Sequence, residues 1–179
     1  CVKLAMDQLC KDRRPDLILS GINHGDNSTV NTHYSGTMGV AIEGCLKYIP
    51  SIAFSSCYYN EDANLEPARP FVRSVVQKVL EKGLPKGICL NVNFPARQEF
   101  LGIKVCRMTY GRWVHEIVKE RHPRNYDYFW VVGQYQNDEP GVEGTDQWAL
   151  QNGFVSITPT TIDVTAYEFM REMESWNLS

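Results

Sequence analysis

The apolar residues of the first half of the chain recur at two spacings. One spacing is that of an amphipathic helix, with apolar residues three or four positions apart, and it predicts helices over residues 2–11, 35–48 and 72–80. The other is a short, wholly apolar run, and it predicts strands over residues 17–19, 51–55 and 88–92. Such runs are typical of parallel strands buried on both faces. The alternation of helix and strand therefore favours an α/β fold with a largely parallel sheet.

The pattern changes after residue 107. Residues Met108 to Tyr135 are rich in β-branched and aromatic side chains, and the polar stretch "KERHPRN" interrupts them. This pattern predicts two long strands and a turn, an extended antiparallel β-hairpin at about 108–136. Its aromatic residues fall on both faces, so we expect the hairpin to pack on another subunit; packing on its own domain is the alternative.

The end of the chain returns to helix and strand signals. The segment "GTDQWALQNGFVSITP" predicts a helix that stops at Gly153, followed by a strand over residues 154–157. The residues from Tyr167 to Trp176 are amphipathic enough to predict a closing helix.

Composition narrows the class of protein. A chain of 179 residues with 43% hydrophobic and 22% charged residues suits one soluble globular domain. A net charge of −3 argues against binding to a nucleic-acid polymer or to an anionic membrane. No apolar run approaches the roughly 18 residues of a membrane span. The six cysteines form no C-x-x-C pair, so we expect reduced thiols and a cytoplasmic location.

A polar stretch, "SGINHGDNSTVNTHYSGTMG" from Ser20 to Gly39, lies between a predicted strand and a predicted helix. In an open parallel α/β sheet, ligands bind beyond the carboxyl ends of the strands, which is where this stretch lies. The helix begins with Ser35-Gly36-Thr37, and a helix start presents unpaired N–H groups that suit a phosphate. The alternative is that Ser35 or Thr37 only caps the helix.

The same stretch contains candidate metal ligands. The amide oxygen of Asn23 suits a hard cation such as Mg²⁺, Ca²⁺ or Mn²⁺, although most loop asparagines bond their own backbone in a turn. His24, His33 and Asp26 are candidates for a transition-metal site, but their spacing along an irregular loop predicts no fixed geometry. A hard divalent ion prefers carboxylates, and no Asp-rich strand end is present in this sequence.

Several motifs in order resemble the signature of the SurE family of survival-protein phosphatases: "PDLILSGINHGDN", "YSGTMGVAIEG", "IPSIAFS", "LNVNFP" and "GTDQWALQNGFVSITP". The resemblance extends from Cys1 to about Thr165. It implies a Rossmann-like, mostly parallel sheet with flanking helices, and a hairpin exchanged between the subunits of a homodimer or homotetramer. It also implies metal-dependent hydrolysis of nucleoside 5′- and 3′-monophosphates, and some members cleave short polyphosphate.

The resemblance also implies roles for individual residues. Asn23 corresponds to the family's ligand of the divalent metal, Mg²⁺ or Mn²⁺, and Asn27 to an asparagine that lines the active site. Ser35, Gly36 and Thr37 correspond to the motif near the phosphate. Ser28-Thr29 stands where many relatives have a glycine.

One part of the family signature is missing from this sequence. The family's two metal-binding aspartates belong to an Asn-Asp-Asp-Gly motif that this sequence does not contain, and a serine ligand from a later loop is also missing. We therefore expect residues 1–179 to form a single domain without its first βα segment. The general base stays unassigned. The alternative is a non-catalytic module that binds phosphate or a nucleotide.

Overall fold

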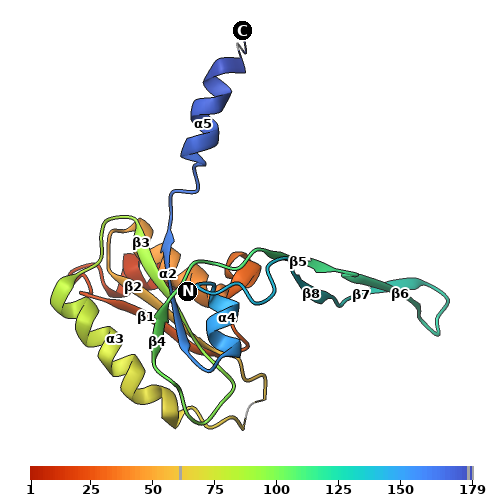
Figure 1. Ribbon diagram of the computed structural model, residues 1–179, viewed down its shortest axis with the longest axis horizontal. Helices are drawn as coiled ribbons and strands as arrows, with labels where there is room; N and C mark the ends of the chain where they lie inside the picture. Colours follow the sequence, from red (N-terminus) through yellow and green to blue (C-terminus); the bar gives the residue numbers. More distant parts are fainter. Residues whose placement is uncertain (61, 177, 179) are drawn as a thin grey trace.

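The computed structural model describes residues 1–60, 62–176 and 178. Its centre is a five-stranded sheet with the strand order β1-β2-β3-β9-β4 (Figure 1). The strands span Ile18–His24 (β1), Ser51–Ser56 (β2), Ile88–Phe94 (β3), Ile103–Val105 (β4) and Val155–Thr161 (β9). β1, β2 and β3 are parallel, whereas β9 runs antiparallel to β3 and pairs in parallel with β4. The predicted α/β fold with a mostly parallel sheet is confirmed.

Two helices cover opposite faces of this sheet. Helix α3 (Arg69–Lys82) packs its Val75 and Val79 against a cluster that contains Ile52 and Phe54 of β2. Helix α2 (Gly36–Leu46) packs on the other face, against a cluster that contains Ala53 of β2. Successive residues of a strand point to opposite faces, which is why Ala53 faces α2 while its neighbours face α3.

Strand β1 differs most from its prediction. It begins at Ile18 and continues to His24, so its second half lies within the polar stretch expected to be a loop. The expectation that this strand is buried on both faces is wrong, because Leu19 is 49% exposed and β1 is an edge strand of the described sheet. The same expectation is confirmed for β2, in which every residue is buried. The short strand β4 was not predicted.

The predicted N-terminal helix is shorter and less buried than expected. Residues Val2–Leu4 form α1, and a π-helical turn (η1) continues it over Ala5–Leu9. None of these residues is buried, and Leu9 is 83% exposed. The described residues therefore leave the apolar face of this helix largely uncovered.

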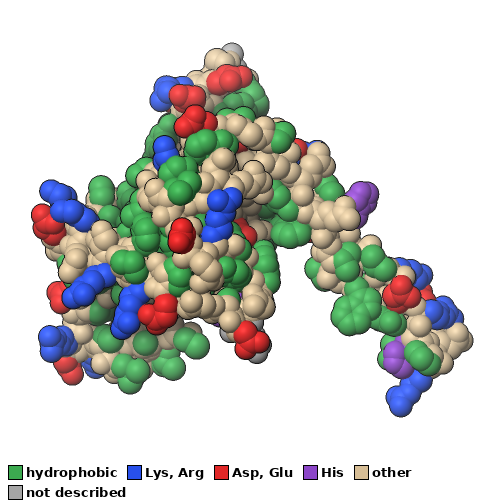
Figure 2. Space-filling view, turned by 60° about the horizontal axis from the view of Figure 1, so that its bottom comes forward, with side chains coloured by type: hydrophobic (Ala, Val, Ile, Leu, Met, Phe, Trp, Pro, Cys, Tyr) green, Lys and Arg blue, Asp and Glu red, His purple; other side chains and the backbone are tan. Residues whose placement is uncertain are grey.

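A long arm extends from the domain (Figure 1). We define the arm as Gly111–Asn137; it contains β5 (Gly111–Val114), β6 (Ile117–Arg121), β7 (Asp127–Val131) and β8 (Gln134–Asn137). β5 pairs with β8, and β6 pairs with β7, both antiparallel. The two long strands of the prediction are thus each interrupted, near His115 (φ 54°) and Gly133 (φ 134°), where the backbone leaves the extended conformation. Figure 2 shows hydrophobic side chains along this arm.

The remaining elements connect and close the chain. They are the 3-10 turns η2 (Thr29–His33) and η3 (Glu66–Ala68), helix α4 (Asp146–Gln151), helix α5 (Tyr167–Met173) and the 3-10 turn η4 (Glu174–Trp176). Helix α5 stands away from the sheet (Figure 1). Within residues 1–60, 62–176 and 178, no helix is both long enough and apolar enough to cross a membrane.

Candidate active site

A cavity of about 470 Å³ lies beyond the carboxyl end of β1. Its lining residues are Asn23, Asn27, Asn31, Tyr34, Ser35, Gly36 and Thr37. The structure therefore brings all five of the predicted site residues to one cavity, although they are spread over 15 positions of the sequence. Asn31 and Tyr34 are additions that the sequence did not single out.

The start of α2 forms one wall of the cavity. Ser35 is the N-cap, and its Oγ accepts a hydrogen bond from the backbone N–H of Met38 (3.0 Å). The first backbone bond of this turn runs from Gly39 N–H to the Ser35 carbonyl (2.9 Å), so the N–H groups of Gly36 and Thr37 precede it. A Cβ atom added at Gly36 would meet no atom within 4 Å, so there is open space beside Gly36, and both Gly36 and Thr37 line the cavity. Ser35 thus acts as a cap, and the helix start also stays accessible to a ligand.

Asn23 lies near the end of β1. Its Nδ2 donates to the carbonyl oxygen of Gly25 (2.7 Å), the turn interaction expected of a loop asparagine. Its Oδ1 has no hydrogen-bond partner among the described residues, so this oxygen is available to a ligand that enters the cavity. The turn bond orients the amide, and the two interpretations of Asn23 are compatible.

The described residues give no support to the alternative of a transition-metal site at His24, His33 and Asp26. His24 Nδ1 donates to the carbonyl oxygen of Asn60 (2.9 Å), and His33 is exposed. In the part of the chain that the structure describes, no group of three or more His, Cys, Asp or Glu side chains is arranged to hold a metal ion. Asp26 instead accepts hydrogen bonds from Ser28.

Asn27 is held by a network of buried polar side chains. Its backbone N–H donates to Asn93 Oδ1 (2.8 Å), and its Nδ2 donates to Ser55 Oγ. Its carbonyl oxygen accepts from Asn91 Nδ2 (2.8 Å) and from Thr32 Oγ1 (2.9 Å). Asn93 Nδ2 donates to Asn91 Oδ1 (2.9 Å), which completes the network. Buried polar groups need such partners, and here they fix the backbone of Asn27.

Sequence reasoning missed Asn91 and Asn93, although both lie in the motif "LNVNFP". Asn91 lies in the strand predicted over residues 88–92, and Asn93 lies just beyond its predicted end; in the structure both belong to β3. The available signal was that two asparagines alternate with apolar residues inside this strand, since a buried asparagine requires hydrogen-bond partners.

A buried carboxylate, Asp146, joins the loop after β1 to Thr109, which lies two residues before the arm and is called the arm root below. Asp146 is the first residue of α4 and is 0% exposed. Its Oδ2 accepts from the backbone N–H of Thr29 (2.8 Å). Its Oδ1 accepts from the N–H (3.0 Å) and Oγ1 (2.6 Å) of Thr109 and from the N–H of Gln147 (2.7 Å). In addition, Trp113 Nε1 of the arm donates to Asn31 Oδ1 (2.9 Å).

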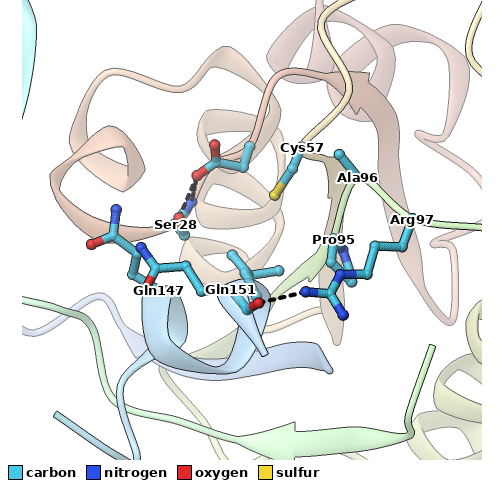
Figure 3. A pocket seen from close by; sticks show the side chains of 9 residues that line it. Ser28, Cys57, Pro95, Ala96, Arg97, Gln147 and Gln151 are labelled. Atoms are coloured by element: carbon cyan, nitrogen blue, oxygen red, sulfur yellow. Dashed lines mark hydrogen bonds between the residues drawn. The ribbon is translucent and has the colours of Figure 1, made fainter. Parts of the chain in front are cut away.

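A second cavity, of about 320 Å³, lies beside the same loop (Figure 3). Asp26 and Ser28, the two neighbours of Asn27, line it together with Cys57, Pro95, Ala96, Arg97, Gln147, Leu150 and Gln151. Arg97 Nη2 donates to the carbonyl oxygen of Gln151 (2.7 Å). Burial, and to a smaller extent the charge of Asp26, raise the pKa of the Cys57 thiol far above its usual value. Cys57 is therefore a neutral thiol at physiological pH and no nucleophile.

Comparison with known proteins decides the family. The family model described as "Survival protein SurE" matches residues 1–115. The chain belongs to the SurE family. It is 53% identical to the 5′-nucleotidase SurE of Phocaeicola vulgatus over 178 residues, which are 99% of this chain and 69% of that protein. It is 52% identical to the 5′-nucleotidase SurE of Bacteroides thetaiotaomicron, with 98% of this chain and 68% of that protein covered.

A solved structure supports the SurE family fold. The crystal structure of the SurE protein from Aquifex aeolicus matches 98% of this chain and 71% of its own chain, with a TM-score of 0.78 and 36% sequence identity. The resemblance seen in the motifs is therefore confirmed at the level of family and fold.

Proposed function

We propose that this protein is a 5′-nucleotidase, a phosphoric monoester hydrolase that releases phosphate from nucleoside 5′-monophosphates. The observation that supports this most directly is the single cavity in which an accessible helix start and the amide oxygen of Asn23 meet. The names of the SurE relatives, 5′-nucleotidase, point to the same reaction.

Residues of this chain would bind and orient the phosphate. The hydroxyl hydrogen of Ser35 stays available for a phosphate oxygen, because Ser35 Oγ acts as an acceptor toward Met38. The N–H groups of Gly36 and Thr37, at the positive end of the helix dipole, favour an anion and stabilise charge that develops on the transferred phosphoryl group. The buried network around Asn27 keeps that side of the cavity rigid, which preserves the position of the substrate.

We further propose that the reaction depends on a divalent cation, Mg²⁺ or Mn²⁺. The unpartnered amide oxygen of Asn23 is a hard, neutral ligand and fits such an ion. The carboxylate ligands belong, by the family resemblance, to an Asn-Asp-Asp-Gly motif that this sequence does not contain. When bound, the ion would polarise the phosphate and lower the pKa of a bound water.

The test is phosphate release by the complete natural polypeptide that carries these 179 residues. We expect release from AMP with Mg²⁺ or Mn²⁺, its loss in EDTA, and its recovery when the ion is restored. Parallel assays with 3′-AMP and short polyphosphate show whether the proposed activity extends to them. Binding of AMP without release of phosphate would favour the non-catalytic module, and release that EDTA does not affect would exclude the metal dependence.

We also propose that the protein is a homodimer or homotetramer assembled through the arm. Strand β7 exposes Phe129 (61%), Trp130 (58%) and Val131 (79%) on its two faces, and a monomer rarely leaves so much apolar surface uncovered. Trp130→Glu is expected to lower the mass measured by light scattering, whereas Arg124→Glu, at the polar turn, serves as the control. An unchanged mass for Trp130→Glu would contradict this assembly.

The six free cysteines are compatible with the proposed cytoplasmic location.

A further inference from the structure

Thr29 has an unusual backbone conformation at the edge of the candidate site. Its φ is 55°, in the left-handed region that β-branched residues rarely adopt. Thr29 is buried and begins η2, two residues after Asn27 and two residues before Asn31. Both of these asparagines line the cavity, whereas Thr29 does not. A rare conformation of this kind persists only where the surrounding structure enforces it.

Three contacts from different elements hold the loop at alternate residues. Asn93 of β3 accepts from the N–H of Asn27, and Trp113 of the arm donates to the side chain of Asn31. Between them, Asp146 of α4 accepts from the N–H of Thr29. The contact to Thr29 is the one made at the strained residue itself.

The two carboxylate oxygens of Asp146 have separate partners. Oδ1 accepts all three hydrogen bonds from Thr109 and Gln147, which fix the carboxylate from the side of the arm root and α4. Among the described residues, Oδ2 accepts only from the N–H of Thr29. Asp146 is completely buried, so it presents Oδ2 to the loop from a fixed position.

We propose that Asp146 is a positioning residue, which holds Thr29 in the left-handed conformation and thereby places Asn27 and Asn31 in the cavity. The proposal rests on the nucleotidase function proposed above. Asp146 does not line the cavity and acts only through the loop. Its connection to Thr109 at the arm root also means that a shift of the arm root reaches the site through this carboxylate.

The first test is Asp146→Asn in the complete polypeptide. The amide oxygen can keep the three donors at the Oδ1 position, and the NH₂ group then faces the N–H of Thr29, so that one contact is lost selectively. Because a displacement of about 1 Å can cost on the order of 100-fold in rate, we expect kcat for AMP to fall about 10- to 100-fold, with a smaller change in KM.

Thr145→Ala is the matched control. Thr145 caps the same helix through Trp148 N–H (3.3 Å), and its side chain forms no hydrogen bond with residues 26–33 among the described residues. Loss of this cap is expected to lower the melting temperature by about 2–4 °C with kcat unchanged within about twofold. Equal effects of Thr145→Ala and Asp146→Asn on kcat would overturn the proposal, because they would indicate a general loss of stability.

A second substitution tests the role of the backbone conformation. Glycine adopts a positive φ without steric cost, so Thr29→Gly should allow the loop to keep its shape without the carboxylate. We expect the double variant Asp146→Asn/Thr29→Gly to have at least about threefold higher kcat than Asp146→Asn alone. A double variant that is no faster than Asp146→Asn would overturn the proposal.

Hydrogen exchange separates this proposal from the proposed function. Without substrate, Asp146→Asn should accelerate amide exchange of residues 27–33 at least about tenfold, and Thr145→Ala should not. Unchanged exchange in Asp146→Asn would overturn the positioning role even if the wild-type protein hydrolyses AMP. If the wild-type protein releases no phosphate, the nucleotidase proposal fails, and the exchange data still decide whether Asp146 holds the loop.

Discussion

Close to the candidate site, the two faces of strands β2 and β3 differ in chemistry although they share one backbone. On the α3 face, Ile52, Phe54 and Phe94 join one apolar cluster. On the α2 face, near the carboxyl ends, Ser55, Asn91 and Asn93 form hydrogen bonds with Asn27 or with one another. Both sets are buried, so the difference lies in the kind of interaction and not in the degree of burial.

Because of this difference, the α3 face contributes mainly to stability, and the α2 face mainly to the arrangement of the site. The α3 face gains free energy from removing apolar surface from water, in proportion to area and with little dependence on direction. The α2 face must satisfy each buried polar group with a partner of defined geometry, and the partner is the loop that lines the cavity. Substitutions on the two faces should therefore have different effects on folding and on turnover.

The largest expected effect is on the apolar face. Ile52→Ala removes a completely buried side chain near the start of β2, away from the cavity, and should lower the free energy of unfolding by about 2–5 kcal/mol. Urea denaturation measures this loss. The kcat of the folded fraction should stay within about threefold of wild type, and a larger fall would show that the two faces are not separable.

The next effect in size is the opposite case, a loss of turnover without a loss of stability. Asn23→Ala removes the proposed metal ligand and should lower kcat on AMP about 100-fold, equivalent to roughly 2.7 kcal/mol of transition-state stabilisation. Melting temperature should change little, because the side chain of Asn23 makes only the bond to Gly25 among the described residues. Asn64→Ala, at an exposed asparagine that does not line this cavity, is the control. Activity of Asn23→Ala within about twofold of wild type would show that the ligand assignment is wrong.

An intermediate effect is expected on the polar face. Asn93→Ala leaves the buried N–H of Asn27 without its partner and should cost about 1–3 kcal/mol of stability. It should also lower kcat about tenfold, because Asn27 loses its fixed position. Combined calorimetry and AMP kinetics distinguish this double effect from that of Ile52→Ala. A loss of stability with unchanged kcat would show that Asn93 contributes to folding only, as Ile52 does.

The smallest effect concerns the helix start next to the polar face. Ser35→Gly keeps most of the capping preference and should cost only a few tenths of a kcal/mol, about 0.3, in stability. It removes the hydroxyl group proposed to donate to phosphate, so the inhibition constant of inorganic phosphate should rise about 3- to 10-fold. An unchanged inhibition constant would leave Ser35 with the role of a helix cap alone.

Local patterns in the sequence were sufficient for several elements and for part of the site. The start of α2, with Ser35 as its cap, and the fully buried strand β2 follow from short-range spacing and chemistry. The five candidate residues were placed by a motif, and the structure brings them to one cavity. The predictions of α2 and β2 succeed because the interactions concerned lie within one turn of helix or one strand. The roles of the five candidate residues stay predictions.

Tertiary structure decided what depends on distant pairing. The extension of β1 to His24 requires β2 as its partner, and the antiparallel direction of β9 requires β3. The anchors of the loop come from even farther along the chain: Asn93 is 66 residues from Asn27, and Asp146 is 117 residues from Thr29. Local propensity does not encode such contacts, because the hydrogen-bond partner of a buried polar group depends on which distant residues the folded chain places next to it. The sequence motifs thus indicated five of the seven residues that line the cavity, and only the folded chain determined the other two and what holds them all in place.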